Sequence, residues 1–416
     1  MDFYRKVLFI LTCAYIVLLP LIPQEVKFKG AAFNDLLFVI LVFVYIINLV
    51  ISKENRKNFI KSVIDFFTNK LSIFMAVLLV AMILSTFYAV DKKLALSESA
   101  RFITYIFIYF LIKYEFNTKK QINILLSGYI FISFLLSCIG IVQHFTEVAL
   151  GANFVKVYEL SGSIRITSTL YHSNTYAAYL ILIIFPVIML SIYEKNKSKK
   201  IFYILLSLLI FVNLLMTFSR NAFLGFALGV VVLALIYSIK LIFALGGLGI
   251  LTLFIPSVLN RVKDIPNLAQ NVSRIKLWKT ALMMIKEHPI LGVGNGNFVT
   301  QYDTYIVKYR LDYNSYTHYP AHNSYLKVQS ELGILGIVSF LGVIVTALFR
   351  VKELYTNTMD GFHKAFYMGV MASMVAFLFM NFSDNLFFVP KATTYFWVLL
   401  ATTEALLNQR SKSIFY

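Results

Sequence analysis

Charged residues are scarce in this chain. Asp, Glu, Lys and Arg make up 14% of its 416 residues, whereas 59% are hydrophobic, and the mean hydropathy is +0.76. Soluble globular domains carry about 25% charged residues, so this composition excludes that class. It indicates an integral membrane protein whose chain crosses the bilayer many times.

Acidic residues are the rarer sign, with 20 Asp and Glu against 38 Lys and Arg. The basic excess does not indicate nucleic-acid binding, because the cations lie mostly between hydrophobic runs, where they set topology and contact anionic headgroups. The chain has two cysteines, Cys13 and Cys138, both inside apolar runs. We therefore expect neither a disulfide nor a thiolate metal site, and no cofactor is indicated.

Long apolar runs are the dominant feature. A helix that crosses the bilayer needs about 20 mainly apolar residues. This criterion predicts about 12 transmembrane helices, near 7–23, 35–51, 71–90, 98–114, 121–145, 174–192, 201–218, 221–239, 241–256, 324–349, 364–384 and 391–408. No repeat or second soluble domain is visible, so the expected fold is all-α, with 1–416 as a single membrane domain.

The distribution of cations predicts the orientation. With a cytoplasmic N-terminus, 20 Lys and Arg fall in the inner segments and eight in the short outer loops. Cytoplasmic loops are the ones enriched in cations. We therefore expect both termini to be cytoplasmic in a multi-pass protein of the cytoplasmic (inner) membrane.

The segment 257–323 is the one long stretch that does not suit a bilayer, and it lies between predicted spans 9 and 10. It carries eight Lys or Arg and a glycine-rich turn, 292–298. We expect it to form an extracytoplasmic loop insertion that contains amphipathic helices. One such helix, 273–288, is predicted to lie on the membrane surface with an apolar stripe that includes Trp278. The turn lacks a preceding strand and a Lys-Ser/Thr ending, so a nucleotide loop is rejected; its backbone N–H groups remain candidates for a phosphate.

Three arginines are candidates for an anionic ligand on the outer side. Arg220 lies between two apolar runs with almost no loop between them, where an arginine either reaches the headgroups or is held in a polar cavity. Arg274 lies in the first turn of the predicted helix 273–288, where it adds charge to free N–H donors. Arg165 precedes a span in a string rich in hydroxyl residues, with Asn174 as a possible helix cap.

His322 is the strongest candidate for a general base. It follows Pro320 at the mouth of a span, and a neutral imidazole accepts a proton near pH 7; His318 is the competing histidine. Asp384 lies at the outer end of a span and could pair with a loop cation, orient His322 or bind a hydroxyl nucleophile. Asn323 is a further substrate-binding candidate.

Tyrosines recur at helical spacing from 301 to 317, and they include Tyr305 and Tyr309. On a helix they form one aromatic stripe. This pattern is typical of an interfacial tyrosine belt, and a platform on which sugar rings stack is the alternative.

Several strings together resemble one known family. They are Ser219-Arg220, the run 274–278 with 289–294 and Phe298, and the run 321–326 with 331–336. They resemble the O-antigen ligases and the related O-antigen polymerases, and the span count and the late external loop agree. The stretch from Arg165 to Asn174 is also similar to the segment that opens a span in these proteins.

The resemblance implies a metal-independent glycosyltransferase. It would move a glycan from undecaprenyl pyrophosphate to an acceptor hydroxyl on the outer face, with inversion at the sugar carbon. The family's essential arginines and histidine would fall on Arg220, Arg274 and His322, and its late acidic residue on Asp384. The acceptor stays open among lipid, glycan and protein. The alternative class is a transporter or flippase of lipid-linked glycan, in which charged residues would line a pathway open to both faces.

Overall fold

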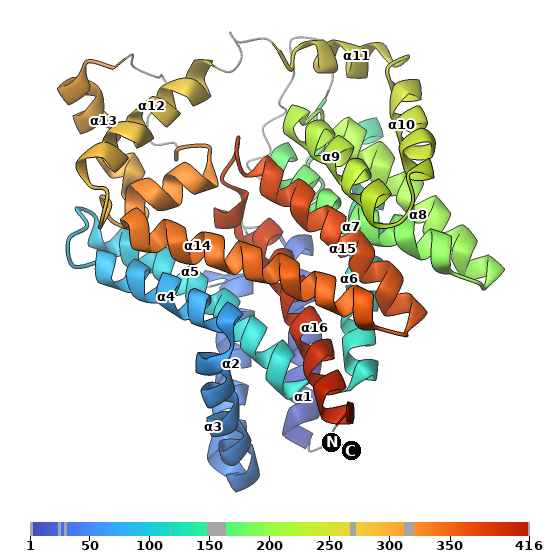
Figure 1. The fold of residues 1–416 in the computed structure, drawn as a ribbon, viewed down its shortest axis with the longest axis horizontal. Coiled ribbons are helices and arrows are strands. Elements are labelled where there is room, and N and C mark those ends of the chain that lie inside the picture. The colour runs from blue at the N-terminus through green and yellow to red at the C-terminus, as the bar shows by residue number, and fades with distance from the viewer. Residues whose placement is uncertain are drawn as a thin grey trace.

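The computed structural model describes residues 3–23, 26–28, 31–116, 118–147, 164–266, 272–311 and 320–414. In this part of the chain the fold is all-α, as predicted, and strands are limited to β1 (Lys27–Phe28) and β2 (Ala31–Ala32), which pair antiparallel. Figure 1 shows a bundle of helices with both chain ends at the bottom and α11, α12 and α13 at the top.

The helices follow one another with short connections. In order they are α1 (Phe3–Leu21), α2 (Phe33–Ile51), α3 (Lys53–Thr68), α4 (Lys70–Ser85), α5 (Lys92–Phe110), the π-helix η1 (Leu111–Glu115), α6 (Lys119–Thr146), α7 (Ser173–Tyr193), α8 (Lys197–Met216), α9 (Arg220–Ile236), α10 (Lys240–Thr252), α11 (Pro256–Lys263), α12 (Val272–Glu287), α13 (Phe298–Tyr309), α14 (Ser324–Asn357), α15 (Gly361–Met380), the 3₁₀ helix η3 (Leu386–Phe388) and α16 (Pro390–Ile414).

Within the described ranges, eight helices are long and apolar enough to cross a membrane, or up to ten if the two bent pairs α3–α4 and α10–α11 each count as one span. The predicted count of about twelve is therefore not confirmed. The difference comes from helices at the margin of the criterion: α9 has 17 residues, and the more polar α16 does not qualify.

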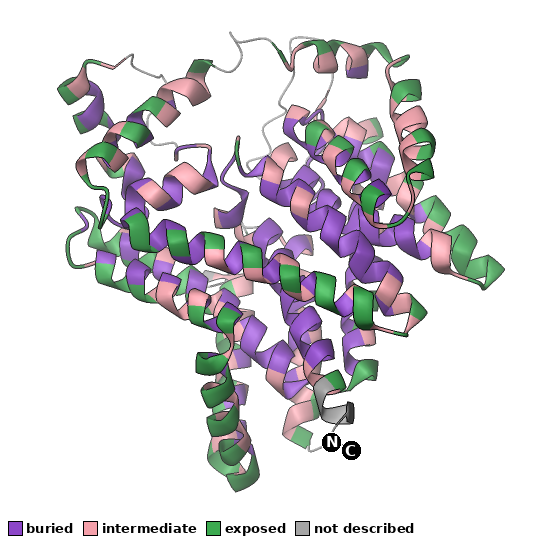
Figure 2. Ribbon diagram, in the orientation of Figure 1, coloured by how far each residue is buried: buried purple, intermediate pink, exposed green. Residues whose placement is uncertain are grey.

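The core of the bundle is the pair α7 and α15. In α7, 89% of the most apolar stretch is buried, against 22% in α2, and Figure 2 shows the buried residues gathered along the central helices. At Gly369 of α15 a Cβ atom would lie 2.3 Å from the backbone nitrogen of Pro186 in α7. Because Gly369 has no side chain, α15 can pack directly against the backbone of α7, and the other helices surround this pair.

A kink in α14 fixes the end of α12 to the bundle. Gly333 has φ 62° and ψ −155°, which interrupts the helix. The backbone N–H of Ile334 donates to Pro289 O at 2.9 Å, and a Cβ at Gly333 would lie 2.1 Å from Ile290 O. Because α12 ends just before Pro289, this contact positions α12 against α14.

One end of the bundle gathers the polar loops. The N-termini of α7, α9, α14 and α16 and the C-termini of α8 and α15 meet there, because consecutive helices alternate in direction. The loops at this end contain the segments 164–172, 217–219, 320–323 and 381–389, so residues far apart in the sequence become neighbours.

Candidate functional site

The loops at this end contain strained backbone. Four non-glycine residues in them have positive φ: Ser168 (50°), Tyr171 (63°), Phe218 (48°) and His322 (48°). Such conformations cost about 1–3 kcal/mol each and persist where the surrounding structure holds them. The remaining two such residues of the described chain cap the C-termini of α6 and α13. Strain outside helix ends is therefore concentrated in the loops that carry the predicted site residues.

His322 and Asp384 form the centre of the site. His322 Nδ1 lies 3.3 Å from Asp384 Oδ1, and their side chains are 28% and 11% exposed. A carboxylate only accepts hydrogen bonds, so we assign a proton to Nδ1, which makes Nε2 the ring nitrogen that can act as a base. Of the roles considered for Asp384, the geometry supports the one that orients His322.

The charge of Asp384 is stabilised by its neighbours. Burial by itself would raise the pKa of this carboxyl, but the hydrogen bond and charge of His322, the charge of Arg274 and the backbone N–H of Asn385 together hold the pKa below its usual value. Asp384 is therefore ionised at neutral pH and accepts the hydrogen bond from His322.

Arg165 reaches the same carboxylate through Asn174. Its Nη2 donates to Asn174 Oδ1 at 3.0 Å, and Asn174 Nδ2 donates to Asp384 Oδ2 at 3.0 Å. Arg165 Nε also donates to Thr217 O at 2.8 Å, which ties this segment to the end of α8. Asn174 was expected to cap a helix; instead α7 begins after His172, and the Asn174 amide bridges arginine and aspartate.

Backbone contacts hold His322 in place. Trp278 Nε1 of α12 donates to His322 O at 3.3 Å, and Asn323 N donates to Asn385 Oδ1 at 3.2 Å. Asn323 Oδ1 accepts from the backbone N–H groups of Tyr325 and Leu326, both at 3.0 Å, so it caps α14. Asn323 thus caps α14 directly after His322. This structural role accounts for an asparagine at this position.

His172 is a neighbour that sequence reasoning did not select. Its side chain is accessible to solvent at the start of α7. Partial desolvation of the ring lowers the pKa of His172, the charge of Asp384 raises it, and the charges of Arg165 and His322 lower it further. His172 therefore interacts electrostatically with the His322–Asp384 pair, and its place two residues before Asn174 was the available signal.

Arg220 and Arg274 line one cavity of about 350 Å³. The rest of its wall is largely apolar and includes Leu224, Trp278 and Phe382. Arg220 Nη1 also donates to Asp264 O at 2.6 Å. The cavity therefore combines two guanidinium groups with an apolar wall, which suits an anionic group attached to a lipid.

Arg261 of α11 is a further cation that sequence reasoning passed over. Its Nε donates to Phe218 O at 2.9 Å, and its Nη1 lies 3.6 Å from Asp264 Oδ2. Phe218 is one of the strained residues, two positions before Arg220. Arg261 and Arg220 thus tie the segment after α11 to the start of α9, and the basic content of 257–323 was the only sequence signal for it.

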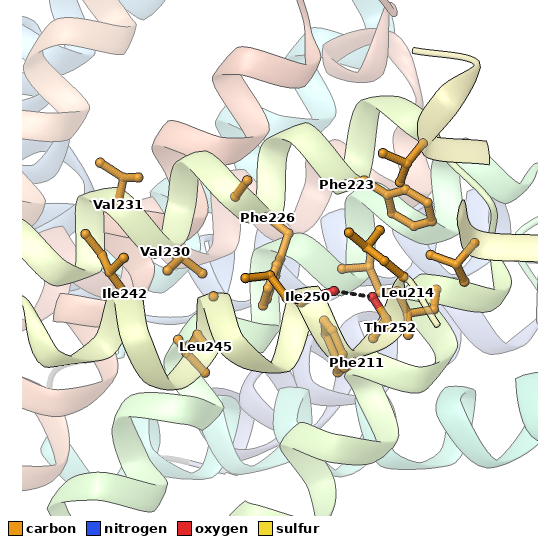
Figure 3. Close-up of a pocket in the computed structure, with 17 residues that line it drawn as sticks. Phe211, Leu214, Phe223, Phe226, Val230, Val231, Ile242, Leu245, Ile250 and Thr252 are labelled. Atoms are coloured by element: carbon orange, nitrogen blue, oxygen red, sulfur yellow. Dashed lines mark hydrogen bonds between the residues drawn. The ribbon is translucent and has the colours of Figure 1, made fainter. Parts of the chain in front are cut away.

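A second, apolar cavity of about 330 Å³ lies between α8, α9, α10 and α11 (Figure 3). In Figure 3, Phe211 and Leu214 of α8, Phe226 and Val230 of α9 and Ile250 of α10 point into this space. Val262 of α11, the residue after Arg261, also lines it. The apolar cavity therefore adjoins the arginine-bearing end of α9 and α11.

The predicted helix 273–288 corresponds to α12, but the tyrosine stripe has another role. Tyr305 Oη donates to Glu287 Oε2 at 2.7 Å, and Tyr309 donates to the other carboxylate oxygen. Hydrogen bonds from Lys308, Tyr309 and Tyr305 lower the pKa of Glu287 to about 2. Tyr305 is buried between α12 and α13, and Tyr309 is half-buried. The remainder of the stripe, 312–317, lies outside the described residues, as does His318.

The glycine-rich turn is structural. The N–H groups of Val293 and Gly294 donate to Ser330 O and Glu331 O, both at 2.9 Å, and the Glu331 carboxylate accepts from Gly296 N at 2.8 Å and Phe298 N at 3.3 Å. The backbone N–H groups of residues 292, 295 and 297 also donate to acceptors within the protein. No N–H group of 292–298 remains for a phosphate, so that expectation is wrong.

Comparisons with known proteins agree with the resemblance. Residues 204–341 match the family model described as O-Antigen ligase, a segment that contains Arg220, Arg274 and His322. Arg165 and Asp384 lie outside it, although hydrogen bonds connect them to His322. The match covers a third of the chain, so the similarity to this family is found in that segment.

Two relatives are named for polysaccharide synthesis. The chain is 23% identical to the teichuronic acid biosynthesis protein TuaE of Bacillus subtilis (strain 168) over 346 residues, 77% of this chain and 67% of that protein. It is 26% identical to a Rickettsia conorii protein named "Putative polysaccharide ligase" over 175 residues, 38% of this chain and 42% of that protein. Together with the apolar helices, these matches support a multi-pass membrane protein that acts as a glycan ligase or polymerase.

Proposed function

We propose that the protein is a glycosyltransferase that moves an oligo- or polysaccharide from undecaprenyl pyrophosphate to an acceptor hydroxyl on the outer face of the cytoplasmic membrane. The observation that carries the proposal is the arrangement at one end of the bundle. There a histidine held by an ionised aspartate lies beside a cavity lined by Arg220 and Arg274.

The two arginines suit a pyrophosphate leaving group. Guanidinium binds phosphate oxygens through two parallel N–H donors and stays charged at any physiological pH. In the apolar surroundings of this cavity the attraction is stronger than in water. Arg220 now donates to a backbone carbonyl, Asp264 O; a phosphate oxygen is the stronger acceptor and would take this hydrogen bond when the donor binds.

The apolar cavity between α8 and α11 suits the polyprenyl tail. It is lined almost wholly by apolar side chains and adjoins Arg261 and the start of α9 (Figure 3). A lipid whose first isoprene units occupy this cavity would have its pyrophosphate at the arginines. The reacting bond would then stay close to the membrane surface.

His322 supplies the base for a single displacement. The acceptor oxygen forms a bond to the anomeric carbon while the bond from that carbon to the pyrophosphate oxygen breaks, and the acceptor proton passes to Nε2 of His322. Asp384 stabilises the imidazolium that results, and the arginines stabilise the negative charge that develops on the leaving group. This reaction inverts the configuration of the donor sugar.

We propose that no metal takes part. The charge on the leaving group is met by arginines, and within the described residues no group of three or more His, Cys, Asp or Glu side chains is placed to hold an ion. The cation distribution supports cytoplasmic termini and an outward-facing site. The acceptor is a hydroxyl of a growing glycan, a lipid or a protein.

The proposal is tested with purified protein in vesicles that contain its native lipid-linked glycan. We expect acceptor-dependent release of undecaprenyl pyrophosphate in the presence of EDTA, and none from His322→Ala. The size of the product distinguishes a polymerase from a ligase. Movement of the lipid-linked glycan across the vesicle without release would overturn the proposal and indicate a transporter.

A further inference from the structure

A third cavity, of about 300 Å³, lies at the same end of the bundle as the transfer site. It is walled by the C-terminus of α1, the N-termini of α2 and α16, and the middle of α5. Its volume is at the lower end of the range for small-molecule sites, about 300–1,000 Å³. It shares no lining residue with the arginine cavity.

The two cavities are walled by opposite ends of one loop. Phe382 and Ser383 line the arginine cavity, and Pro390 and Lys391 line the third cavity, with Asp384 between them in the chain. Lys391 Nζ donates to Thr169 O at 3.1 Å, so this cavity also adjoins the 164–172 loop of the site. The loop 381–389 and the segment 164–172 therefore both connect the third cavity to the part of the bundle that carries Asp384.

The third cavity is lined by both hydrogen-bond acceptors and hydrogen-bond donors. Asn34 Oδ1 is buried and accepts no hydrogen bond from the described part of the chain, and Asp35 forms no ion pair there. Arg101 Nη1 is held by Glu98 Oε1 at 2.6 Å and lines the opposite wall. A buried acceptor without a donor costs about 1–3 kcal/mol, so Asn34 indicates a ligand that carries hydrogen-bond donors.

An aromatic wall completes the cavity. The rings of Tyr15 and Tyr105 line it, and Tyr105 stacks on Trp397 with ring centroids 6.2 Å apart and an interplanar angle of 12°. Sugar hydroxyls donate to carboxylate and amide oxygens and accept from guanidinium, and the C–H face of a sugar packs on aromatic rings. A phosphate headgroup has no donor for Asn34 and is repelled by Asp35.

We propose that this cavity binds a sugar unit of the acceptor glycan, away from the hydroxyl that reacts. The inference rests on the proposed transfer reaction. In an in-line displacement the acceptor approaches opposite the leaving group, so it needs a binding surface separate from the arginine cavity. The third cavity shares no lining residue with the arginine cavity, and the loop that carries Asp384 connects the two. It follows that the acceptor is a glycan chain whose distal sugar anchors between α1, α2, α5 and α16.

The two tryptophans of the chain, Trp278 and Trp397, allow a direct test. In a Trp278→Phe background, Trp397 behind Tyr105 reports on this cavity. The probe is native glycan released from its lipid by mild acid, which carries no pyrophosphate. We expect a saturable change in Trp397 emission that Arg101→Gln weakens about tenfold and that Lys93→Gln, an exposed cation on the same helix, leaves unchanged.

A kinetic test keeps the native tryptophans. Arg101→Gln and Asp35→Asn should raise KM for the acceptor about tenfold while kcat and KM for the donor stay within about twofold. Unchanged acceptor KM, a Trp397 response that survives Arg101→Gln, or the same response to phosphatidylethanolamine vesicles alone would overturn the inference. Binding at Trp397 without any transfer would instead mean that the cavity holds glycan and that the transferase proposal fails.

Discussion

Two polar clusters lie at opposite ends of this apolar molecule, and they differ in how their charges are matched. Near the chain ends, the buried Lys113 lies 3.2 Å from Asp65 and 3.4 Å from Glu404, and Arg350 binds the same Glu404. At the other end, arginines line a cavity and strained loops present a half-exposed histidine.

The difference separates a structural from a functional use of buried charge. The cluster near the chain ends, here called the Lys113 cluster, joins η1, α3, α14 and α16, and its opposite charges contact one another directly, so it is complete without a ligand. The cluster at the other end, here called the His322 cluster, includes arginines that line space that an anion can enter. We infer that the Lys113 cluster stabilises the fold and that the His322 cluster performs the reaction.

The largest effect is expected at His322. His322→Ala removes the base, and loss of a general base lowers rates by about 10²–10⁴. Steady-state transfer should fall by that amount while expression and thermal stability stay normal. His288→Ala, an exposed histidine that ends α12, is the matched control and should retain full activity. Equal losses in the two variants would remove His322 from the reaction.

Substitutions that keep the positive charge test whether Arg220 and Arg274 bind the pyrophosphate through two parallel N–H donors. Arg220→Lys and Arg274→Lys keep the charge but lose the two parallel donors, so we expect them to stay at least about tenfold below wild type in kcat/KM. The control is Arg56→Lys in the distant helix α3. Full turnover in either site variant would disprove bidentate binding of the pyrophosphate.

The orienting role of Asp384 predicts a smaller loss. Asp384→Asn keeps the shape but removes the charge that stabilises the imidazolium. Hydrogen bonds to charged groups contribute about 1.5–3 kcal/mol, which corresponds to a roughly ten- to hundredfold lower kcat. Donor KM should change little, because Asp384 does not line the arginine cavity. A change confined to donor KM would assign Asp384 to binding.

In the Lys113 cluster we expect a loss of stability rather than of turnover. Lys113→Met leaves Asp65 and Glu404 without their shared cation, and breaking a buried pair costs about 3–5 kcal/mol. Thermal stability should drop clearly, whereas turnover per folded molecule should stay within about twofold. A selective loss of turnover at normal stability would show that the Lys113 cluster takes part in function.

The smallest effect is expected at Tyr305. Tyr305→Phe removes one hydrogen bond to Glu287 and should lower stability by about 1 kcal/mol, with transfer unchanged. A tenfold rise in acceptor KM would restore the sugar-platform hypothesis for this helix.

The sequence predicted the fold class and the helix α12 well, because composition and helical periodicity depend on local residues. It did not predict the exact spans, since α9 and α16 lie at the margin of any length or hydropathy rule. The break between α10 and α11 is marked in the sequence by Pro256, the first residue of α11, but the angle between the two helices depends on packing.

The sequence singled out candidate residues one by one but not their network. Arg220, Arg274, His322 and Asp384 stand out as polar groups in apolar surroundings, and the structure brings them to one end of the bundle. The bridge from Arg165 through Asn174 to Asp384 includes a hydrogen bond between Asn174 and Asp384, which are 210 positions apart, so it follows only from the packing of α7 against α15. The prediction that the glycine-rich turn could bind a phosphate was wrong because Glu331, which lies outside the motif, accepts hydrogen bonds from N–H groups of the turn.

The central claim is that the acceptor oxygen attacks the donor sugar directly, with His322 holding its proton and the arginines holding the departing pyrophosphate. The most direct measurement is the anomeric configuration of the new linkage, determined by NMR on product made from a donor of known configuration. The account predicts inversion. Retention would contradict it, because retention requires a second displacement that this site is not proposed to perform.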